Sequence, residues 1–492
     1  MDGFWHPGGS VVTALGVFFE VAALLMVPLV LLRQKEPSAT IAWILTLIFL
    51  PAVGAVLFVL FGRDRVRLPA QRKREWDAAV RAQMAAHAPQ ALQAHLASDP
   101  ALEGAGGTTE LERALFRVGA QLTHGRPSGG NAVQMLFGGD DAYAALGAAI
   151  DAAKHHVHAE FYLIRNDATG AWFRERLVAA ASRGVKVRLL CDGFGCFALG
   201  GGWSRPLKRA GGSFARFLPM RSVLLQPVNL RNHRKILVVD GSVGFTGGIN
   251  VGDEYRGTMP GVGEWRDVHM GIRGRATADL QRVFLQDWAF ATGEIVPPGE
   301  YFPDVAPAAG DATVAIVPSG PDTRTEAIHR LFFGAIAGAR DRVVITTPYF
   351  VPDAPILVAL ELAAMRGVDV RILLPHRSNH RVTFHAGRSF YDRLIEAGVH
   401  VYEYLPGMVH AKTMVVDGAL ALVGSANMDL RSFRLNFEVG AMLHDADAAA
   451  RLEESFAKDI ERSALVTLDA WRARPVRYRF MEGAARLISP LL

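Results

Sequence analysis

The chain has 492 residues, of which 50% are hydrophobic and 21% are charged, and this balance excludes a disordered or collagen-like protein. Its length exceeds one ordinary hydrophobic core, so two or three domains are expected, and its two cysteines exclude a disulfide framework. A net charge of +5 over this length is only weak evidence for a polyanionic partner, and it suits anionic lipid headgroups as well as nucleic acid.

Two apolar stretches near the amino terminus are each long enough to cross a bilayer as a helix. Residues 11–32 are 22 long and carry one charge, Glu20, and residues 41–61 are 21 long and carry none. About 20 apolar helical residues span the hydrocarbon core. A signal peptide would have a basic start and a shorter apolar core. The sequence therefore predicts a two-helix transmembrane hairpin over residues 1–62.

The basic residues around these stretches predict an orientation. The loop between the stretches contributes only Arg33 and Lys35. The residues behind the second stretch contribute Arg63, Arg65, Arg67, Arg72, Lys73 and Arg74. By the positive-inside rule, we expect a multi-pass membrane protein whose large carboxy-terminal part is cytoplasmic.

The next segment, residues 63–130, is polar, rich in alanine and interrupted by proline and glycine. We interpret it as a linker with helical segments. A Pro-rich stretch at 297–310 divides the rest of the chain into two parts of ordinary domain size. We therefore expect one domain over residues 131–305 and a second over residues 306–492.

These two parts repeat each other. Residues 149–162 match 335–349, and residues 183–190 match 366–373, where both copies contain Arg-Gly-Val. Strands alternate with helices in each copy. This alternation predicts an α/β sandwich with a largely buried sheet in each of two tandem halves.

Each half also contains the same polar phrase: a histidine, a lysine two residues later, an aspartate, and an asparagine after a small-residue segment. The phrase comprises His233, Lys235, Asp240 and Asn250 in the first half, and His410, Lys412, Asp417 and Asn427 in the second. A repeat that served packing alone would preserve apolar residues instead. Two matched polar sets therefore indicate one active site built from two similar halves with a pseudo-twofold axis.

The apolar runs inside each phrase predict a hairpin. Asp-Gly, at 240–241 and at 417–418, is a strong hairpin signal. Period two places His233 and Lys235 on the same strand face, and the returning run brings the asparagine close to them. The two aspartates belong to the motif that we assign to catalysis, but we interpret them as hairpin caps rather than proton carriers.

A phosphodiester is the substrate that this set of residues suits. A lysine neutralises a non-bridging oxygen, and an asparagine donates to the others. One neutral histidine can attack phosphorus, and the other, when protonated, can give a proton to the leaving alcohol. Each imidazole needs an acceptor for its second nitrogen. Asp267 follows the first phrase and Glu438 follows the second, and we expect these two to orient the histidines. The mechanism needs no metal and no other cofactor.

The two copies of this phrase resemble the phospholipase D superfamily over roughly residues 130–465. Within it, the chain is most similar to the bacterial cardiolipin synthases. Further motifs carry that similarity: the amino-terminal hairpin, Ser319-Gly320-Pro321, Thr347-Pro348-Tyr349-Phe350, Asn427-Met428-Asp429-Leu430-Arg431-Ser432, Asn436-Phe437-Glu438 and the closing Ser489-Pro490-Leu491-Leu492. The first copy departs slightly, with Gly248 where the second has Ser425, and we expect this change to cost only a hydroxyl donor.

The resemblance implies a transfer between two phosphatidylglycerol molecules at the bacterial inner membrane. The first gives its phosphatidyl group to a histidine and releases glycerol, and the headgroup hydroxyl of the second then attacks to give cardiolipin. By analogy with the family, His233 is the nucleophile and His410 the acid and base. The partners expected are phosphatidylglycerol and anionic membrane lipid, with no nucleic acid, and the sequence leaves the oligomeric state open.

Three other functions remain compatible with these residues. The first is a phospholipase D-type hydrolase with water as acceptor. The second is a transferase that uses phosphatidylethanolamine, and the third is a non-catalytic lipid-binding membrane protein, although neither phrase has lost its histidine or lysine. The tail 471–492 mixes arginines with Trp471, Tyr478 and Phe480. This amphipathic tail either lies on an anionic membrane or packs on the body as a final helix.

Overall fold

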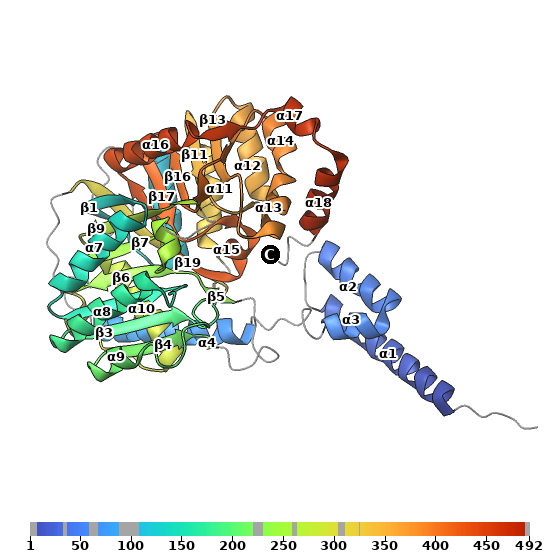
Figure 1. Cartoon of the computed structure of the whole chain (residues 1–492), viewed down its shortest axis with the longest axis horizontal. Coiled ribbons are helices and arrows are strands. Elements are labelled where there is room, and N and C mark those ends of the chain that lie inside the picture. The colour runs from blue at the N-terminus through green and yellow to red at the C-terminus, as the bar shows by residue number, and fades with distance from the viewer. Residues whose placement is uncertain are drawn as a thin grey trace, which may run out of the picture. The chain divides into compact units, whose positions relative to one another are not determined.

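The computed structural model describes residues 7–32, 37–58, 67–87, 108–219, 230–257, 263–303, 310–323 and 325–487. The chain divides into two compact units (Figure 1). The first contains Met1–Pro69 and Arg221–Pro227, and the second contains Ala70–Met220 and Val228–Leu492. The predicted boundary between residues 305 and 306 lies outside the described residues.

The described residues of the first unit include apolar helices, but the predicted transmembrane hairpin is not found among them. Helix α1 spans Pro7–Leu31, while the second apolar stretch is split into α2 (Pro37–Phe49) and α3 (Pro51–Leu57). The split occurs because Pro51 has no N–H to donate within a continuous helix, so it begins a new one. No helix of the described part of the chain is long and apolar enough to cross a bilayer.

The described residues of the predicted linker, 67–87 and 108–130, are largely helical. Helix α4 spans Arg67–His87, and α6 spans Glu110–Thr123 and begins with a capping box between Thr109 and Glu112. Lys73 of α4, one of the basic residues behind the second apolar stretch, is not exposed to solvent. Its side chain is buried, forms an ion pair with Asp77 and lies 3.0 Å from Asp287 of the body.

The second unit contains one large mixed sheet made of two halves with the same strand order. The first half runs β1 (Ser128–Phe137), β9 (Val268–Arg273), β7 (Val243–Gly247), β6 (Lys235–Val239), β2 (His156–Phe161), β3 (Lys186–Asp192) and β4 (Ser213–Phe217). The second runs β10 (Ala312–Ser319), β19 (Asn436–His444), β17 (Leu420–Gly424), β16 (Thr413–Val416), β11 (Arg342–Thr346), β13 (Asp369–Pro375), β14 (His400–Tyr404) and β20 (Ser463–Leu465). The halves join where β1 pairs antiparallel with β10. The predicted α/β fold with tandem halves is therefore confirmed.

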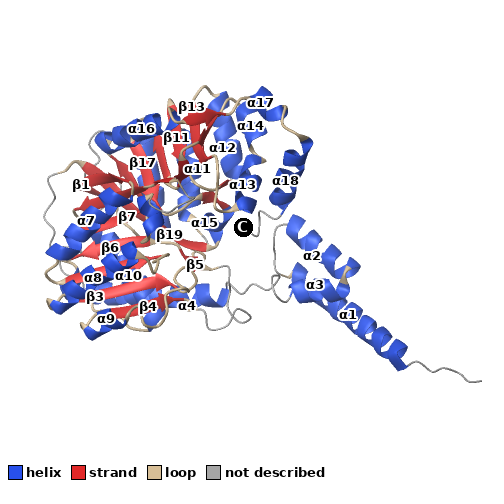
Figure 2. Ribbon diagram, in the orientation of Figure 1, coloured by secondary structure: helices blue, strands red, loops and turns tan. Residues whose placement is uncertain are grey.

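Helices cover both faces of this sheet (Figure 2). In β6, Ile236 and Val238 pack in one apolar core, and Leu237 and Val239 pack in another on the opposite face. The helices that follow β1 in the chain are α7 (Gly139–Ala152), α8 (Ala168–Ser182), α9 (Arg205–Arg209), α10 (Thr277–Thr292), α11 (Ala327–Gly338), α12 (Ala354–Met365), α13 (Arg381–Arg388), α14 (Tyr391–Glu396), α15 (Leu430–Arg434), α16 (Ala446–Ile460), α17 (Leu468–Arg472) and α18 (Val476–Leu487). Since alternate residues of a buried strand face opposite ways, both cores are needed to bury it.

Short elements complete the fold. They are β5 (Arg231–Asn232), β8 (Glu264–Arg266), β12 (Phe350–Val351), β15 (Gly407–Val409), β18 (Met428–Asp429), and the 3₁₀ turns η2 (Asp253–Arg256) and η3 (Gly299–Tyr301). Two of the short pairings cross between the halves: β5 pairs with β19, and β15 pairs with β8.

The two hairpins that the sequence predicts are present, as β6–β7 and β16–β17. Asp240 and Asp417 occupy their turns with positive φ values of 51° and 50°. The Asp240 carboxylate accepts hydrogen bonds from three consecutive backbone N–H groups, 154–156, and Asp417 accepts from 340–342. Both aspartates therefore fix the turn to the start of the neighbouring strand, in line with their interpretation as hairpin caps rather than proton carriers.

Candidate active site

A cleft of about 1180 Å³ lies where the two polar phrases meet. Both histidines and both asparagines of the phrases line it, together with Tyr162 of the first half. The structure thus brings the predicted residues of the two halves to one place. The lysines of the two phrases are buried beside their histidines rather than in the open cleft.

Each histidine is held by a carboxylate from the opposite half. His233 Nδ1 lies 3.0 and 3.1 Å from the two carboxylate oxygens of Glu438. His410 Nδ1 lies 2.7 Å from Asp267 Oδ2. The sequence predicts the right carboxylates, but their order along the chain associates each with the histidine of its own half. The exchange means that neither half alone contains a complete histidine–carboxylate pair.

The crossing follows from the two short strand pairings between the halves. Next to the β5–β19 pair, the backbone N–H of His233 donates to the carbonyl of Phe437 at 2.8 Å. Next to the β15–β8 pair, His410 donates to the carbonyl of Arg266 at 2.6 Å. Glu438 follows Phe437 in the chain, and Asp267 follows Arg266. Each backbone bond therefore places a histidine next to one of these carboxylates, which reaches its ring.

The two carboxylates are supported differently. Glu438 accepts hydrogen bonds from Ser425 Oγ at 2.5 Å and Asn436 Nδ2 at 3.1 Å. Asp267 is one methylene shorter, and the backbone at Gly248, the counterpart of Ser425, comes close to it. A Cβ at position 248 would lie 2.1 Å from Asp267 Oδ1. Gly248 is therefore required because no side chain fits beside Asp267. The sequence predicted only the loss of a hydroxyl donor at this position.

The lysines lie under the histidines. Lys235 Nζ donates to the carbonyl of His233 at 2.6 Å, and Lys412 Nζ lies 2.8 Å from His410 Nδ1. Burial lowers the pKa of Lys235 to about 7 and that of Lys412 to about 8. Their ammonium groups are therefore poised to gain from any anion that enters the cleft.

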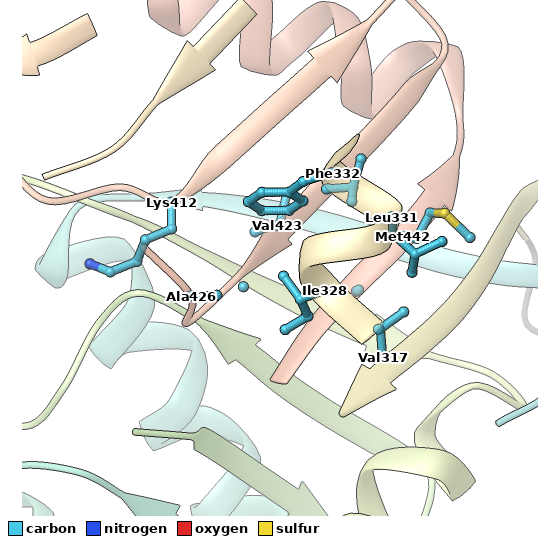
Figure 3. Close-up of a pocket in the computed structure, with 12 residues that line it drawn as sticks. Val317, Ile328, Leu331, Phe332, Lys412, Val423, Ala426 and Met442 are labelled. Atoms are coloured by element: carbon cyan, nitrogen blue, oxygen red, sulfur yellow. The ribbon is translucent and has the colours of Figure 1, made fainter. Parts of the chain in front are cut away.

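The stem of Lys412 borders a small apolar hollow of about 20 Å³ (Figure 3). In Figure 3 the amine extends away from Phe332, Leu331 and Ile328. The hollow is too small for a lipid headgroup. Lys412 lines it together with apolar side chains, while its charged end is directed at His410.

The electrostatics leave both imidazoles neutral before substrate binds. Burial lowers the pKa of His233 to about 4 and that of His410 to about 3, and in both cases the neighbouring carboxylate opposes the shift. Burial also opposes ionisation of Asp267 and Glu438, but the facing histidines and lysines outweigh it and lower the pKa of both carboxyls. The negative charges of the two carboxylates are thus offset by the positive charges of the two protonated lysines.

The two asparagines differ in how many hydrogen bonds their side-chain amides already make within the protein. Asn250 accepts from the backbone N–H of Leu163 at 3.2 Å and donates to Tyr255 Oη at 2.5 Å. The Asn427 side-chain oxygen, by contrast, has no hydrogen-bond partner in the described residues. Asn427 therefore has the freer amide for a ligand, and Asn250 mainly ties the first half together.

Arg234 stands between His233 and Lys235, and the motif alone assigns it no role. Its Nε donates to the carbonyl of Glu438 at 3.0 Å, and its guanidinium forms an ion pair with Asp287. Arg234 thus holds the backbone of the carboxylate that orients His233. Nothing along the chain signals this contact, because 204 residues separate its two ends.

Comparisons with known proteins agree with this geometry. A family model described as "Cardiolipin synthase, PLD-like domain" matches residues 146–258 and 332–460, and a model described as "Phospholipase_D-nuclease N-terminal" matches residues 21–63. A cardiolipin synthase of Halalkalibacterium halodurans is 38% identical, with 99% of this chain and 95% of that protein covered. A cardiolipin synthase of Geobacillus kaustophilus is 37% identical, with 100% and 96% covered.

Among solved structures, a phosphatidylserine synthase of Haemophilus influenzae superposes with a TM-score of 0.58 at 14% identity. The match covers 77% of this chain and 100% of that one. At this identity the likeness concerns the fold alone.

Proposed function

This chain belongs to the cardiolipin synthase family of phospholipase D-like enzymes, and from that membership we propose how its cleft performs the transfer. Two phosphatidylglycerol molecules give cardiolipin and glycerol through a phosphohistidine. The observation that carries the proposal is the pair of histidines in one cleft, each held at Nδ1 by a carboxylate. That bond leaves Nε2 of each ring for the reacting atoms.

The first step forms the phosphohistidine. Nε2 of one neutral histidine attacks the phosphorus of the donor lipid, and the bond between phosphorus and the glycerol oxygen breaks. The second histidine, which is protonated, gives its proton to that oxygen, and glycerol leaves. The phosphatidyl group is now bonded to the first histidine, and the second is neutral.

The second step reverses these roles. A primary hydroxyl of the second phosphatidylglycerol gives its proton to the neutral histidine and attacks phosphorus. The nitrogen–phosphorus bond breaks, cardiolipin is released, and both histidines return to their starting states. The resemblance implies His233 as the nucleophile and His410 as acid and base.

The entering phosphodiester supplies the charge that this scheme requires. The low pKa values suit a neutral nucleophile, whereas the second histidine must hold a proton. A phosphate anion between Lys235 and Lys412 adds negative charge within reach of both rings. It therefore raises the histidine pKa in the complex, and the amide of Asn427 donates to an oxygen that gains charge in the transition state.

The experiment that tests the proposal is a product assay. Purified protein in mixed micelles receives phosphatidylglycerol as the only phospholipid, and mass spectrometry measures the products. We expect cardiolipin with an equal amount of glycerol. Protein denatured rapidly by detergent at mildly alkaline pH, where the nitrogen–phosphorus bond is stable, should carry one phosphatidyl group on a histidine of the two phrases. Phosphatidic acid without cardiolipin would show a hydrolase instead, and activity only after addition of phosphatidylethanolamine would show a different lipid pair.

We also propose that the amino-terminal unit holds the enzyme at the bacterial inner membrane as a multi-pass segment, with the catalytic unit cytoplasmic. The family-model match over residues 21–63 and the two long apolar stretches support this. Many described side chains of these helices, such as Phe18, Leu25 and Phe49, are apolar and exposed in the isolated chain. A lipid environment would cover them. Labelling of single cysteines placed at either end of each stretch, in intact cells and in lysed cells, tests the topology.

A further inference from the structure

The cleft contains a buried cation that the proposed chemistry does not use. Arg231 lies two residues before His233, lines the cleft and is 5% exposed. Its Nη1 donates to the carbonyl of Leu230 at 2.7 Å, and its guanidinium lies 4.3 Å from the centre of the Phe194 ring. Its Nη2 has no hydrogen-bond partner in the described residues. Burying a guanidinium N–H without an acceptor costs free energy of folding, and a ligand that accepts this hydrogen bond removes the cost.

No carboxylate of the described residues forms an ion pair with Arg231. The acidic group that acts on it most strongly, Asp192, is occupied by backbone N–H groups of Phe194, Gly195 and Asn232, at 2.8 to 2.9 Å. Burial lowers the pKa of the Arg231 guanidinium, and Asp192 opposes this shift. An arginine remains charged even so. The Arg231 guanidinium therefore has no direct ion-pair partner in the described residues, although the charge of Asp192 acts on it from nearby.

Two further polar residues lie at this end of the cleft. Asn436 of β19 pairs with Arg231 of β5, and its Nδ2 donates to Glu438. Its side-chain oxygen is buried and has no partner in the described residues. Arg431 of α15 lines the same cleft and is close enough to Arg231 to affect its pKa.

The matching positions of the second half have different chemistry. Met408 lies two residues before His410, as Arg231 lies two before His233. Trp265 lies two residues before Asp267, as Asn436 lies two before Glu438, and Met408 pairs with Trp265. The catalytic residues are thus matched across the pseudo-twofold axis, while one end of the cleft has an arginine and an amide where the other has two apolar side chains.

We propose that Arg231, with Arg431 and Asn436, binds the headgroup of the acceptor lipid, an inference that rests on the proposed function. The acceptor phosphatidylglycerol carries a phosphodiester of its own, which does not react. A guanidinium recognises such a phosphate through two parallel hydrogen bonds. The oxygen of Asn436 accepts a hydrogen bond from the secondary hydroxyl of the acceptor's glycerol, the hydroxyl that stays free in cardiolipin.

The spacing fits this assignment. Residues two apart in extended chain are about 7 Å apart, so the Arg231 end lies about that far from His233 along the strand. The two phosphorus atoms that a glycerol bridges are separated by six bonds of roughly 1.5 Å each. A bridge of that length joins a reacting phosphate beside the histidines to a second phosphate at Arg231. The subsite therefore distinguishes an anionic lipid acceptor from water or a simple alcohol.

The test makes two acceptors compete in one assay. Full-length enzyme in mixed micelles receives phosphatidylglycerol and ethanol, and mass spectrometry measures cardiolipin and phosphatidylethanol. In the Arg231→Met variant, which installs the residue found at the matching position, we expect the ratio of cardiolipin to phosphatidylethanol to fall at least tenfold. Arg231→Lys keeps the charge without the planar fork, so its ratio should lie in between. Arg393→Met, which removes an exposed arginine paired with Glu361, should keep the wild-type ratio.

The outcomes separate this inference from the proposed function. An unchanged ratio in Arg231→Met would overturn the subsite, and so would an equal fall of both products in a folded variant. If that variant is unfolded and gives neither product, Arg431→Met decides in the same assay by the same criterion. Wild-type enzyme that makes phosphatidylethanol but no cardiolipin would overturn the proposed function itself, and the subsite with it.

Discussion

At the scale of single residues, the most consequential feature is the exchange of carboxylates between the halves. The ring of His233 depends on Glu438, and the ring of His410 depends on Asp267. A carboxylate at Nδ1 fixes the tautomer and stabilises the imidazolium that forms when the other nitrogen takes a proton. In the proposed mechanism, each histidine therefore depends on a carboxylate of the other half.

Glu438→Gln is expected to lower kcat for cardiolipin formation by about 10³-fold, because the amide can hold the ring in the wrong tautomer. Asp267→Asn should have a comparable effect. The crossing is checked by nitrogen NMR of the histidine rings: Glu438→Gln should change the signals of His233 and leave those of His410 nearly unchanged. A change confined to His410 would contradict the exchange.

The lysine pKa values predict how activity responds to pH. The pKa of Lys235 is about 7 and that of Lys412 about 8, so rising pH removes the charges that attract the phosphodiester. We expect kcat/KM to fall as pH rises from 7 to 9. The histidines, at about 4 and about 3, stay neutral over this range in the free enzyme. At saturating lipid the fall should move to higher pH, because the bound anion stabilises the protonated lysines. A kcat/KM that rises between pH 7 and 9 would contradict this.

Some of the site could be predicted from residues alone, and some could not. The repeated spacing identified His233, His410 and their lysines because chemistry fixes which side chains a phosphodiester site needs. The pairing of carboxylates depends on short strand contacts between distant segments, which spacing along the chain does not encode. The requirement for Gly248 likewise depends on how closely the backbone approaches Asp267.

At the scale of elements, α4 is the clearest difference from expectation. It follows the membrane segment in sequence, and its basic residues looked like a flank of that segment. Lys73 is instead part of a buried ion network with Asp77, Asp287 and Arg234. Burial lowers the pKa of the Lys73 amine, but the aspartates outweigh this and raise it above its ordinary value. Composition could not separate a buried lysine from a solvated one, because both occur on amphipathic helices.

Lys73→Met should destabilise the catalytic unit by about 3 kcal/mol, since removal of one partner leaves buried carboxylates uncompensated. Thermal unfolding in detergent measures the shift. The matched control is Lys458→Met on α16, which removes an exposed lysine that pairs with Glu454 one turn away, and it should leave the midpoint unchanged. Because Asp287 also holds Arg234, and Arg234 holds the backbone of Glu438, the folded Lys73→Met variant should lose activity as well. Equal midpoints for the two variants would contradict the network.

At the scale of the whole molecule, the duplicated sequence forms one sheet rather than two separate domains. Strand β1 pairs with β10, so hydrogen bonds run from one half into the other. The exchanged carboxylates add a second connection, at the cleft. This continuity holds the two similar halves together at one cleft. The repeat predicted a shared site, but it did not predict a continuous sheet, because the sequence was divided into two domains with a sheet in each. Which strands join the halves was not predictable either, because both halves offer equivalent edges.

The first 62 residues are expected to serve placement rather than chemistry, since every residue of the cleft belongs to the second unit. A chain that lacks residues 1–62 should keep kcat within about threefold on short-chain phosphatidylglycerol in detergent, and it should leave the membrane fraction after a high-salt wash. A chain that lacks residues 1–87 is the contrasting variant: it also loses Lys73, so it should unfold at a lower temperature. If the 63–492 chain stays with the membrane after the wash, another surface holds it there. Helix α18 is then the element to change, because Val476, Phe480 and Leu487 are exposed on its outer face while Glu482 and Ala485 are buried on the other.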